Sequence, residues 1–232
     1  MKERGMIFNG EMVRAILDGR KTQTRRIMKL QPKPSKSRPG DFWFSSKKLE
    51  SMVHVSDLAP GNSPIADYHL FIQEHCCPFG AVGDRIWVRE AFRVHSRATD
   101  VATLVYKASE RNSWTEQTHR VPVAVCNKPA TPEKWTPSLH MPRWASRILL
   151  EITDVRVERL NAISEEDARA EGIIDGGCLN CGEPEPCGCA NPEPDATDAF
   201  AYLWQSIYGQ ENWNADPWVW VIEFKRVEGG ES

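Results

Sequence analysis

The sequence predicts an α+β protein that has a β-rich core and a few short helices. The β prediction comes from alternating apolar residues over about 147–159 and from a terminal run of β-forming residues over 217–225. Helix signals occur at about 10–18, 164–171 and 197–208. The 232 residues are 41% hydrophobic and 26% charged, which is typical of a globular protein, and we expect a single domain over 1–232.

The helix predictions depend on capping residues at the ends of apolar stripes. Gly19 stands where a left-handed cap would close the first helix. Ser164 is an N-cap followed by acidic residues, and Gly172 ends that helix. In the third helix the apolar spacing i, i+3, i+4, i+7 stops at Gly209.

Strand-like segments lie between these helices. The longest changes its alternation near Asp154, which suggests a bulge. Residues 31–80 contain many prolines, so we expect an irregular insertion there. The other predicted strands cover about 83–94, 103–107 and 120–125.

Charge is unevenly distributed along the chain. Residues 1–50 hold 13 Lys and Arg against 5 Asp and Glu, and the totals of 29 and 32 leave 16 basic and 27 acidic residues elsewhere. A locally basic region suits a small anionic ligand or one stretch of nucleic acid, although a disordered basic arm is the alternative. No run reaches the roughly 18 apolar residues of a membrane span, and no signal core is present, so we expect a cytoplasmic protein without membrane contact.

The basic run that follows the first helix is the leading candidate for chemistry. Lys21, Thr24, Arg25 and Arg26 put a hydroxyl among several cations. Such a group can hold a phosphate, or a Thr hydroxyl can act as a nucleophile if Lys21 loses its charge by desolvation. In an extended run Lys21 and Thr24 fall on opposite faces, so a joint role needs a bend.

The order of the motifs resembles the ASCH domain family. The matching segments are Leu17-Asp-Gly-Arg-Lys-Thr-Gln-Thr-Arg-Arg26, Val82-Gly-Asp-Arg-Ile-Trp-Val88, the strand at 147–159, Ile163-Ser-Glu-Glu-Asp-Ala-Arg-Ala-Glu-Gly172 and the final strand. The resemblance implies a PUA-like β-barrel with flanking short helices. The segment Trp135-Thr-Pro-Ser-Leu-His-Met-Pro-Arg143 is similar to the long form found in phages and prophages, and it implies a phage or prophage origin.

The resemblance also implies a reaction. Small bacterial ASCH proteins include an amidohydrolase that acts on N4-acetylcytidine, and its catalytic set corresponds to Lys21, Thr24 and Glu171. Thr24, or a water that it orients, would attack the acyl carbonyl while Lys21 takes the proton and Glu171 orients Lys21. Glu171 can equally be a solvent-facing residue beside a helix cap. A non-catalytic reader of RNA or modified nucleic acid and a ribonuclease are the alternatives.

The expected partner is therefore a nucleoside, RNA or DNA, bound in a cleft between the basic run and the helix at 164–171. Aromatic, basic and acidic side chains can stack on a base, bind phosphate and accept from an exocyclic amine. Trp87 can also be a core aromatic residue, and His140 a loop histidine. The candidates for binding are Arg20, Arg25, Arg26, Trp87, Arg89, Glu90, His140 and Arg143.

Four of the seven cysteines fall within twelve residues, in a second insertion over 175–195 that is rich in Gly and Pro. Four thiolates can surround one tetrahedral ion, so we expect a structural zinc that leaves no open position for catalysis. A reduced loop or a disulfide is the alternative, and no organic cofactor is expected. The proposed ligands are Cys178, Cys181, Cys187 and Cys189.

Overall fold

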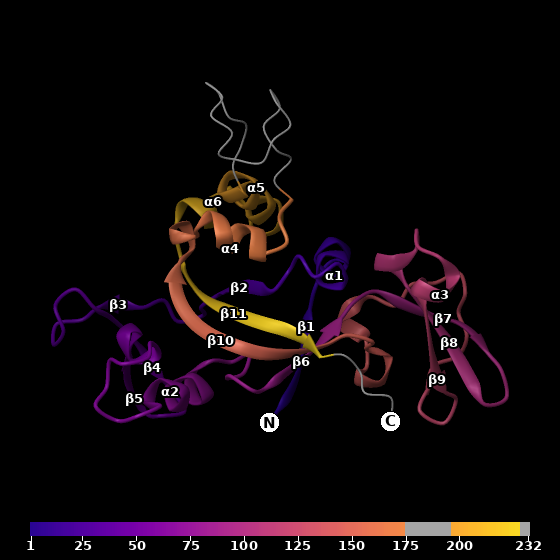
Figure 1. Cartoon of the computed structure of the whole chain (residues 1–232), viewed down its shortest axis with the longest axis horizontal. Coiled ribbons are helices and arrows are strands. Elements are labelled where there is room, and N and C mark those ends of the chain that lie inside the picture. The colour runs from indigo at the N-terminus through magenta and orange to yellow at the C-terminus, as the bar shows by residue number, and fades with distance from the viewer. Residues whose placement is uncertain (175–195, 228–232) are drawn as a thin grey trace, which may run out of the picture. The chain divides into compact units, whose positions relative to one another are not determined.

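The computed structural model of the chain describes residues 1–174 and 196–227. These residues form helices and three β-sheets, which confirms the α+β prediction (Figure 1). The chain forms two compact units, the first from residues 1–19, 83–151 and 225–227 and the second from 20–82, 152–174 and 196–224. Two of the boundaries between the units fall inside strands, β10 (Leu149–Arg159) and β11 (Trp218–Val227). The single-domain assignment stays a prediction.

The first unit combines a small mixed sheet with an antiparallel meander. Strand β1 pairs in parallel with β6, and β6 pairs antiparallel with the start of β10. Strands β7, β8 and β9 pair antiparallel in that order around a core that contains Phe92, Leu104 and Tyr106. The elements are β1 (Glu3–Ile7), α1 (Gly10–Leu17), β6 (Arg85–Arg89), β7 (Phe92–Arg97), β8 (Val101–Tyr106), the 3-10 helix η2 (Lys107–Ser109), α3 (Trp114–Gln117), β9 (Thr118–Pro122), η3 (Ser138–His140) and η4 (Arg143–Ala145).

In the second unit, strands β10, β11 and β2 are neighbours in that order, and helices α4, α5 and α6 gather beside them (Figure 1). Buried side chains of α4 and α5 pack on Val219 and Val221 of β11, and Ile27 of β2 joins the same core. The elements are β2 (Gln23–Ile27), β3 (Lys33–Pro34), β4 (Phe42–Ser46), β5 (Ser51–His54), η1 (Val55–Leu58), α2 (Tyr68–Cys76), η5 (Leu160–Ala162), α4 (Glu165–Ala170), α5 (Ala196–Tyr208) and α6 (Gln210–Asn214).

The stretch 31–80 is more regular than its prolines predict. It contains the antiparallel sheet β3-β4-β5 and helix α2. The rings of Phe42 and Phe44 contact Trp218 and Trp220, with centroids 4.9 and 6.0 Å apart. The expectation of an irregular insertion was wrong. Aromatic residues far away in the sequence pack on β4, and the local Pro and Gly signals do not reveal such contacts.

The three helix predictions are confirmed to within two residues at each end. Gly19, Gly172 and Gly209 all have positive φ, as glycines that close a helix do. In the described ranges no helix has the length and apolarity needed to cross a bilayer. The strand orders seen in these ranges are open, and the PUA-like barrel stays a prediction.

Candidate functional site

The basic run enters the second unit through a short bridge and then joins the sheet. Lys21 forms an isolated β-bridge with Glu171, and the Thr22 amide donates to the Ala170 carbonyl at 2.8 Å. From Gln23 onward the chain is β2, which pairs with β11 without a register shift. The run is therefore held on one side by β11 and on the other by the end of α4.

Lys21 and Glu171 form a buried ion pair. The Lys21 Nζ donates to Glu171 Oε2 at 2.6 Å and to the Glu171 carbonyl at 2.8 Å. The Lys21 side chain is 0% exposed and the Glu171 side chain 4%. Burial lowers the pKa of Lys21, and the charge and hydrogen bond of Glu171 offset this only in part. Glu171 is thus a buried partner of Lys21, and not the solvent-facing residue that we considered.

Arg25 links the same carboxylate to two others. Its Nη2 lies 2.6 Å from Asp167 Oδ2 and 3.2 Å from Glu158 Oε2, and its Nη1 lies 3.5 Å from Glu171 Oε1. The Arg25 side chain is 0% exposed. Burial opposes ionisation of Asp167, but hydrogen bonds and charges from Arg25 and Arg156 outweigh it and hold its pKa below the ordinary value.

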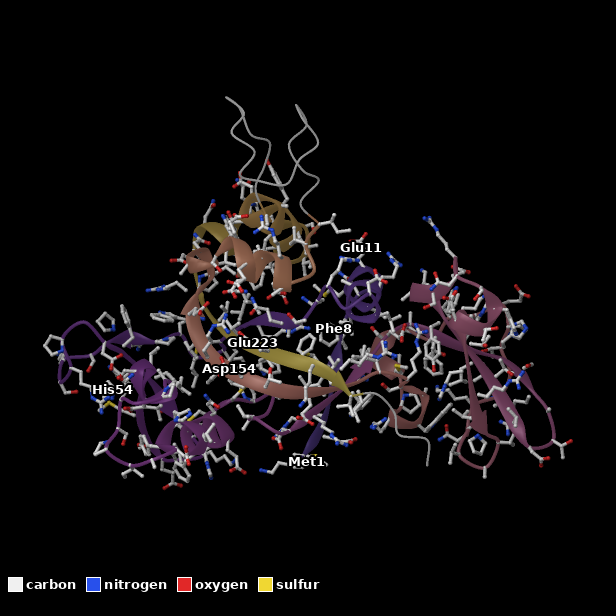
Figure 2. The ribbon with its side chains drawn as sticks, viewed as in Figure 1. Met1, Phe8, Glu11, His54, Asp154 and Glu223 are labelled. Atoms are coloured by element: carbon white, nitrogen blue, oxygen red, sulfur yellow. The ribbon has the colours of Figure 1, made fainter. Side chains whose placement is uncertain are left out.

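Arg156 on β10 extends this cluster toward the protein surface. It donates to Asp167 at 3.0 Å and to Glu158 at 2.6 Å, and it also contacts Asp154 and Glu223, which are labelled in Figure 2. Glu158, Asp167 and Glu223 overcome the effect of burial and raise the pKa of Arg156. Lys21, Arg25, Arg156, Glu158, Asp167 and Glu171 are called the ionic cluster below.

Helix α4 positions the acidic half of the ionic cluster. The Ser164 side chain accepts from the Asp167 amide, which starts the helix, and Glu171 is its C-cap. Asp167 and Glu171 are four residues apart, so both side chains lie on one face of the helix. The same face meets the odd-numbered residues of the run: Gln23 Nε2 donates to the Asp167 carbonyl at 3.0 Å, as Arg25 does to the Asp167 carboxylate.

Thr24 lies on the other face of β2. Side chains alternate along a strand, and Gln23, Arg25 and Ile27 all face α4 and α5. Thr24 is buried and pairs with Ile222 of β11, on the side where Phe44 meets Trp220. The structure therefore joins Lys21 to Glu171 but directs the Thr24 hydroxyl away from them. Arg26 shares the face of Thr24, and Arg20 donates to the Gly172 carbonyl at 2.8 Å.

The other residues predicted to bind belong to the first unit. The Arg89 guanidinium lies 5.4 Å from the centre of the Trp87 ring, and Arg89 also donates to the Ser138 carbonyl. Trp87 is half-buried, so it is neither a fully enclosed core residue nor a freely exposed ring. Arg143 pairs with Glu3 at 2.9 Å, and His140 is exposed in η3.

Glu90 is the most enclosed of these first-unit residues. Its two carboxylate oxygens accept from Arg147 Nε at 2.9 Å and Arg147 Nη2 at 3.1 Å. Burial raises the pKa of Glu90, and Arg147 offsets part of that effect. Arg147 was not identified from the sequence, because no local pattern connects it to Glu90, fifty-seven positions away.

Arg25 and Asp167 carry a signal in the sequence that places them beside Lys21 and Glu171. Arg25 alternates with Lys21 and Gln23 in an extended run, so the three share a face of the strand. Asp167 precedes Glu171 by four residues in a helix, so the two share a face of the helix. Glu158 and Arg156 carry no such signal, because only the position of β10 brings them to the cluster.

The predicted zinc ligands Cys178, Cys181, Cys187 and Cys189 lie outside the described residues. Among the described residues, Cys76, Cys77 and Cys126 form no disulfide. Over residues 1–174 and 196–227, no group of three or more His, Cys, Asp or Glu side chains is placed to hold a metal.

Comparison with known proteins found no protein family, no curated protein sequence and no solved structure that matches this chain.

Proposed function

We propose that this chain is an ASCH-type protein with a PUA-like core that binds a nucleoside and hydrolyses the amide of an N4-acylated cytidine at Lys21 and Glu171. The observation that carries the proposal is the buried ion pair between these residues. Burial lowers the pKa of Lys21, which brings a lysine closer to the range in which it can accept a proton.

The reaction needs one water and no cofactor. A neutral Lys21 takes a proton from the water as its oxygen attacks the acyl carbonyl carbon. The tetrahedral intermediate then collapses, the bond between carbon and N4 breaks, and the proton passes from Lys21 to the departing N4. Acetate and cytidine are the products. Glu171 holds the Lys21 amine in position through the hydrogen bond at 2.6 Å.

Water is the preferred nucleophile because of where Thr24 lies. The Thr24 side chain is on the face of β2 opposite to Arg25, whose guanidinium reaches Glu171. A direct attack by the Thr24 hydroxyl with Lys21 as its base needs a hydrogen bond between the two side chains. A change at Thr24 is thus expected to act through packing, and changes at Lys21 to act on chemistry.

The test is turnover of N4-acetylcytidine, with cytidine separated by chromatography. Lys21→Arg keeps a cation beside Glu171 but cannot deprotonate, so we expect it to lose turnover while it stays folded. Lys29→Ala, an exposed lysine just beyond β2, is the matched control and should keep wild-type turnover. Circular dichroism of each variant separates loss of chemistry from loss of structure.

Full activity in Lys21→Arg would contradict the role of Lys21 as a base. The proposal also requires Thr24→Ala to retain measurable turnover. Loss of turnover in a folded Thr24→Ala variant would return Thr24 to the catalytic set and replace the water mechanism.

A non-catalytic reader of RNA or modified nucleic acid is the second candidate. The complete enclosure of Lys21 and Arg25 favours it, because enclosed ion pairs also serve to join elements. The reader hypothesis expects no turnover by the wild-type protein and an affinity for RNA that falls steeply with salt. Shortening of labelled RNA that carries no acyl group would instead indicate a ribonuclease.

A further inference from the structure

The antiparallel sheet β7-β8-β9 of the first unit packs on a hydrophobic core with one of its two faces (Figure 1). Phe92, Leu104 and Val121, one from each strand, belong to that core. Side chains alternate along a strand, so Arg93, next to Phe92, and Arg120, next to Val121, project from the opposite face. The face that points away from the core therefore carries cations from both outer strands.

These three strands carry positive charge and no negative charge. Strand β7 contains Arg93 and Arg97, β9 contains Arg120, and none of the three strands contains Asp or Glu. Within the described part of the chain, neither Arg93 nor Arg120 forms an ion pair. Arg147 of the same unit, by contrast, is held by Glu90. The charge on the outward face is therefore not neutralised internally and can meet an external anion.

Two tryptophan rings accompany these cations. The Arg93 guanidinium lies 4.5 Å from the centre of the Trp135 ring, and it also donates to the Pro132 carbonyl, which holds it in place. His95, the extra residue at the bulge of β7, places its ring 4.9 Å from that of Trp114. Trp114 is 51% exposed and Trp135 is half-buried, and neither belongs to the core of the sheet. The aromatic-basic surface consists of Arg93, His95, Trp114, Arg120 and Trp135.

We propose that the aromatic-basic surface binds single-stranded nucleic acid, with unpaired bases stacked on its tryptophan rings and phosphates held by its arginines. A single strand offers the faces of its bases to an aromatic ring, whereas a duplex keeps them stacked inside. The Cα atoms of Arg93 and Arg120 are two strands and two residues apart, or about 12 Å, so one short stretch of strand can reach both. Stacking reads no hydrogen-bond pattern, and we expect little sequence preference.

This proposal goes beyond the proposed hydrolysis and does not rest on it. The aromatic-basic surface belongs to the first unit, whereas Lys21 and Glu171 belong to the second. It also places nucleic-acid contact away from Arg25, which is enclosed in the ionic cluster. Strand binding needs no proton transfer by Lys21, so the two proposals can fail separately.

The experiment is a fluorescence-anisotropy titration of the full chain with labelled oligouridine, oligothymidine and a DNA duplex, each about 12 nucleotides long, which is within the usual site size. Single strands should bind at least about tenfold more tightly than the duplex, because only they lend a base face to each ring. The comparison of oligouridine with oligothymidine identifies RNA or DNA as the preferred strand.

Trp114→Ala tests the stacking contact. It should weaken single-strand binding by about tenfold, the effect of one lost base stack, and Trp114→Phe should retain most of the affinity. Tyr202→Ala removes a ring of the second unit that is 70% exposed, so it is the matched control and should bind like the wild-type protein.

Arg120→Ala tests the phosphate contact through salt. It should reduce the slope of log affinity against log salt concentration by roughly 0.7, as one phosphate contact fewer does on a single strand. Arg226→Ala, an exposed arginine of β11 outside this surface, should leave the slope unchanged. The substituted side chains are all exposed, and circular dichroism checks that each variant is folded.

Equal affinity for duplex and single strands would overturn the stacking role of the rings, and no saturable binding would overturn the site. Unchanged affinity and salt slope in both Trp114→Ala and Arg120→Ala would move the strand to another surface. Displacement of the strand by polyglutamate as readily as by unlabelled oligouridine would assign the surface to an acidic protein instead. Single-strand binding by a wild-type protein without turnover of N4-acetylcytidine would support this proposal while it removes the proposed hydrolysis.

Discussion

Lys21 owes its chemical character to its surroundings, because a lysine in water stays charged up to high pH. Here the side chain has no exposure and makes both of its hydrogen bonds to one residue, Glu171. Burial disfavours the charged form, while Glu171 favours it. These contacts also join the residues just before β2 to the end of α4.

Replacing Lys21 tests this balance through stability. In Lys21→Met, Glu171 loses its nearest cation, and we expect a loss of about 3 kcal/mol in unfolding free energy at pH 7. The double variant Lys21→Met with Glu171→Gln should lose less, since no buried charge is left without its partner. Urea unfolding measures both, and Lys29→Met serves as the exposed control. Equal losses in the single and double variants would contradict a coupled pair.

The contribution of Lys21 to the free energy of unfolding changes with pH in one direction. The pKa of Lys21 is lowered in the folded protein from 10.5, so between the folded value and 10.5 the unfolded chain binds more protons. The contribution of Lys21 to stability therefore rises with pH through this window and is lost as pH falls through the folded pKa. Relative to Lys21→Met, the wild-type protein should gain stability on going from neutral pH toward pH 10.5.

At the scale of elements, α4 is short but carries most of the acidic side of the ionic cluster. Six residues make fewer than two turns, and isolated helices of this length are unstable in water. Its persistence depends on the Ser164 cap, on Ala168 in the core and on the pairing of Asp167 with Arg25. Local capping and tertiary contacts thus support the same element.

Removing the cap tests how far α4 depends on it. Ser164→Ala deletes the acceptor for the Asp167 amide, and we expect a loss of about 1 kcal/mol in unfolding free energy. Ser164→Asp should retain most of the stability, because aspartate caps as well and its charge suits a helix start. Thermal or urea unfolding gives the values. A loss in Ser164→Ala below the error of the measurement would show that tertiary contacts alone hold the helix.

Elements with strong local signals were predicted well, and elements without them were not. The helix at 164–171 has a cap, acids in its first turn and a glycine stop, and it occurs as α4. Along β10, Leu150 and Ile152 are buried and then Val155 and Val157, which confirms the change of phase near Asp154. Strands β4 and β5 escaped prediction, because β4 packs on the distant Trp218 and Trp220 and β5 pairs with β4.

At the scale of the whole molecule, the chain builds separate cores. The first unit encloses residues around Phe92 and Tyr106, and the second encloses residues around Phe200 and Trp204. Each unit has its own buried ionic group, Glu90 with Arg147 in the first and the ionic cluster in the second. The binding residues that the sequence assigned to one pocket are thus divided between the units.

The cysteine motif permits a test on the intact protein. If Cys178, Cys181, Cys187 and Cys189 bind zinc, a chelator should lower the melting temperature by roughly 5 °C, because a metal bound only to the folded state stabilises it. Cys181→Ser should abolish both the zinc content and the response to chelator, while Cys76→Ser, a half-buried free thiol, should retain both. Absence of zinc by elemental analysis and an unchanged melting temperature would contradict the metal site.

The sequence by itself determined the short helices, the β-rich character and the candidate pair of Lys21 and Glu171, the last through family resemblance. Caps, glycine stops and apolar periodicity act between near neighbours, so they can be recognised in the sequence. Only the tertiary structure decided that Arg25 shares Glu171, that Thr24 faces the other way and that Arg147 orients Glu90. These contacts join residues far apart in sequence, and they exist because strand pairing and burial bring their side chains together.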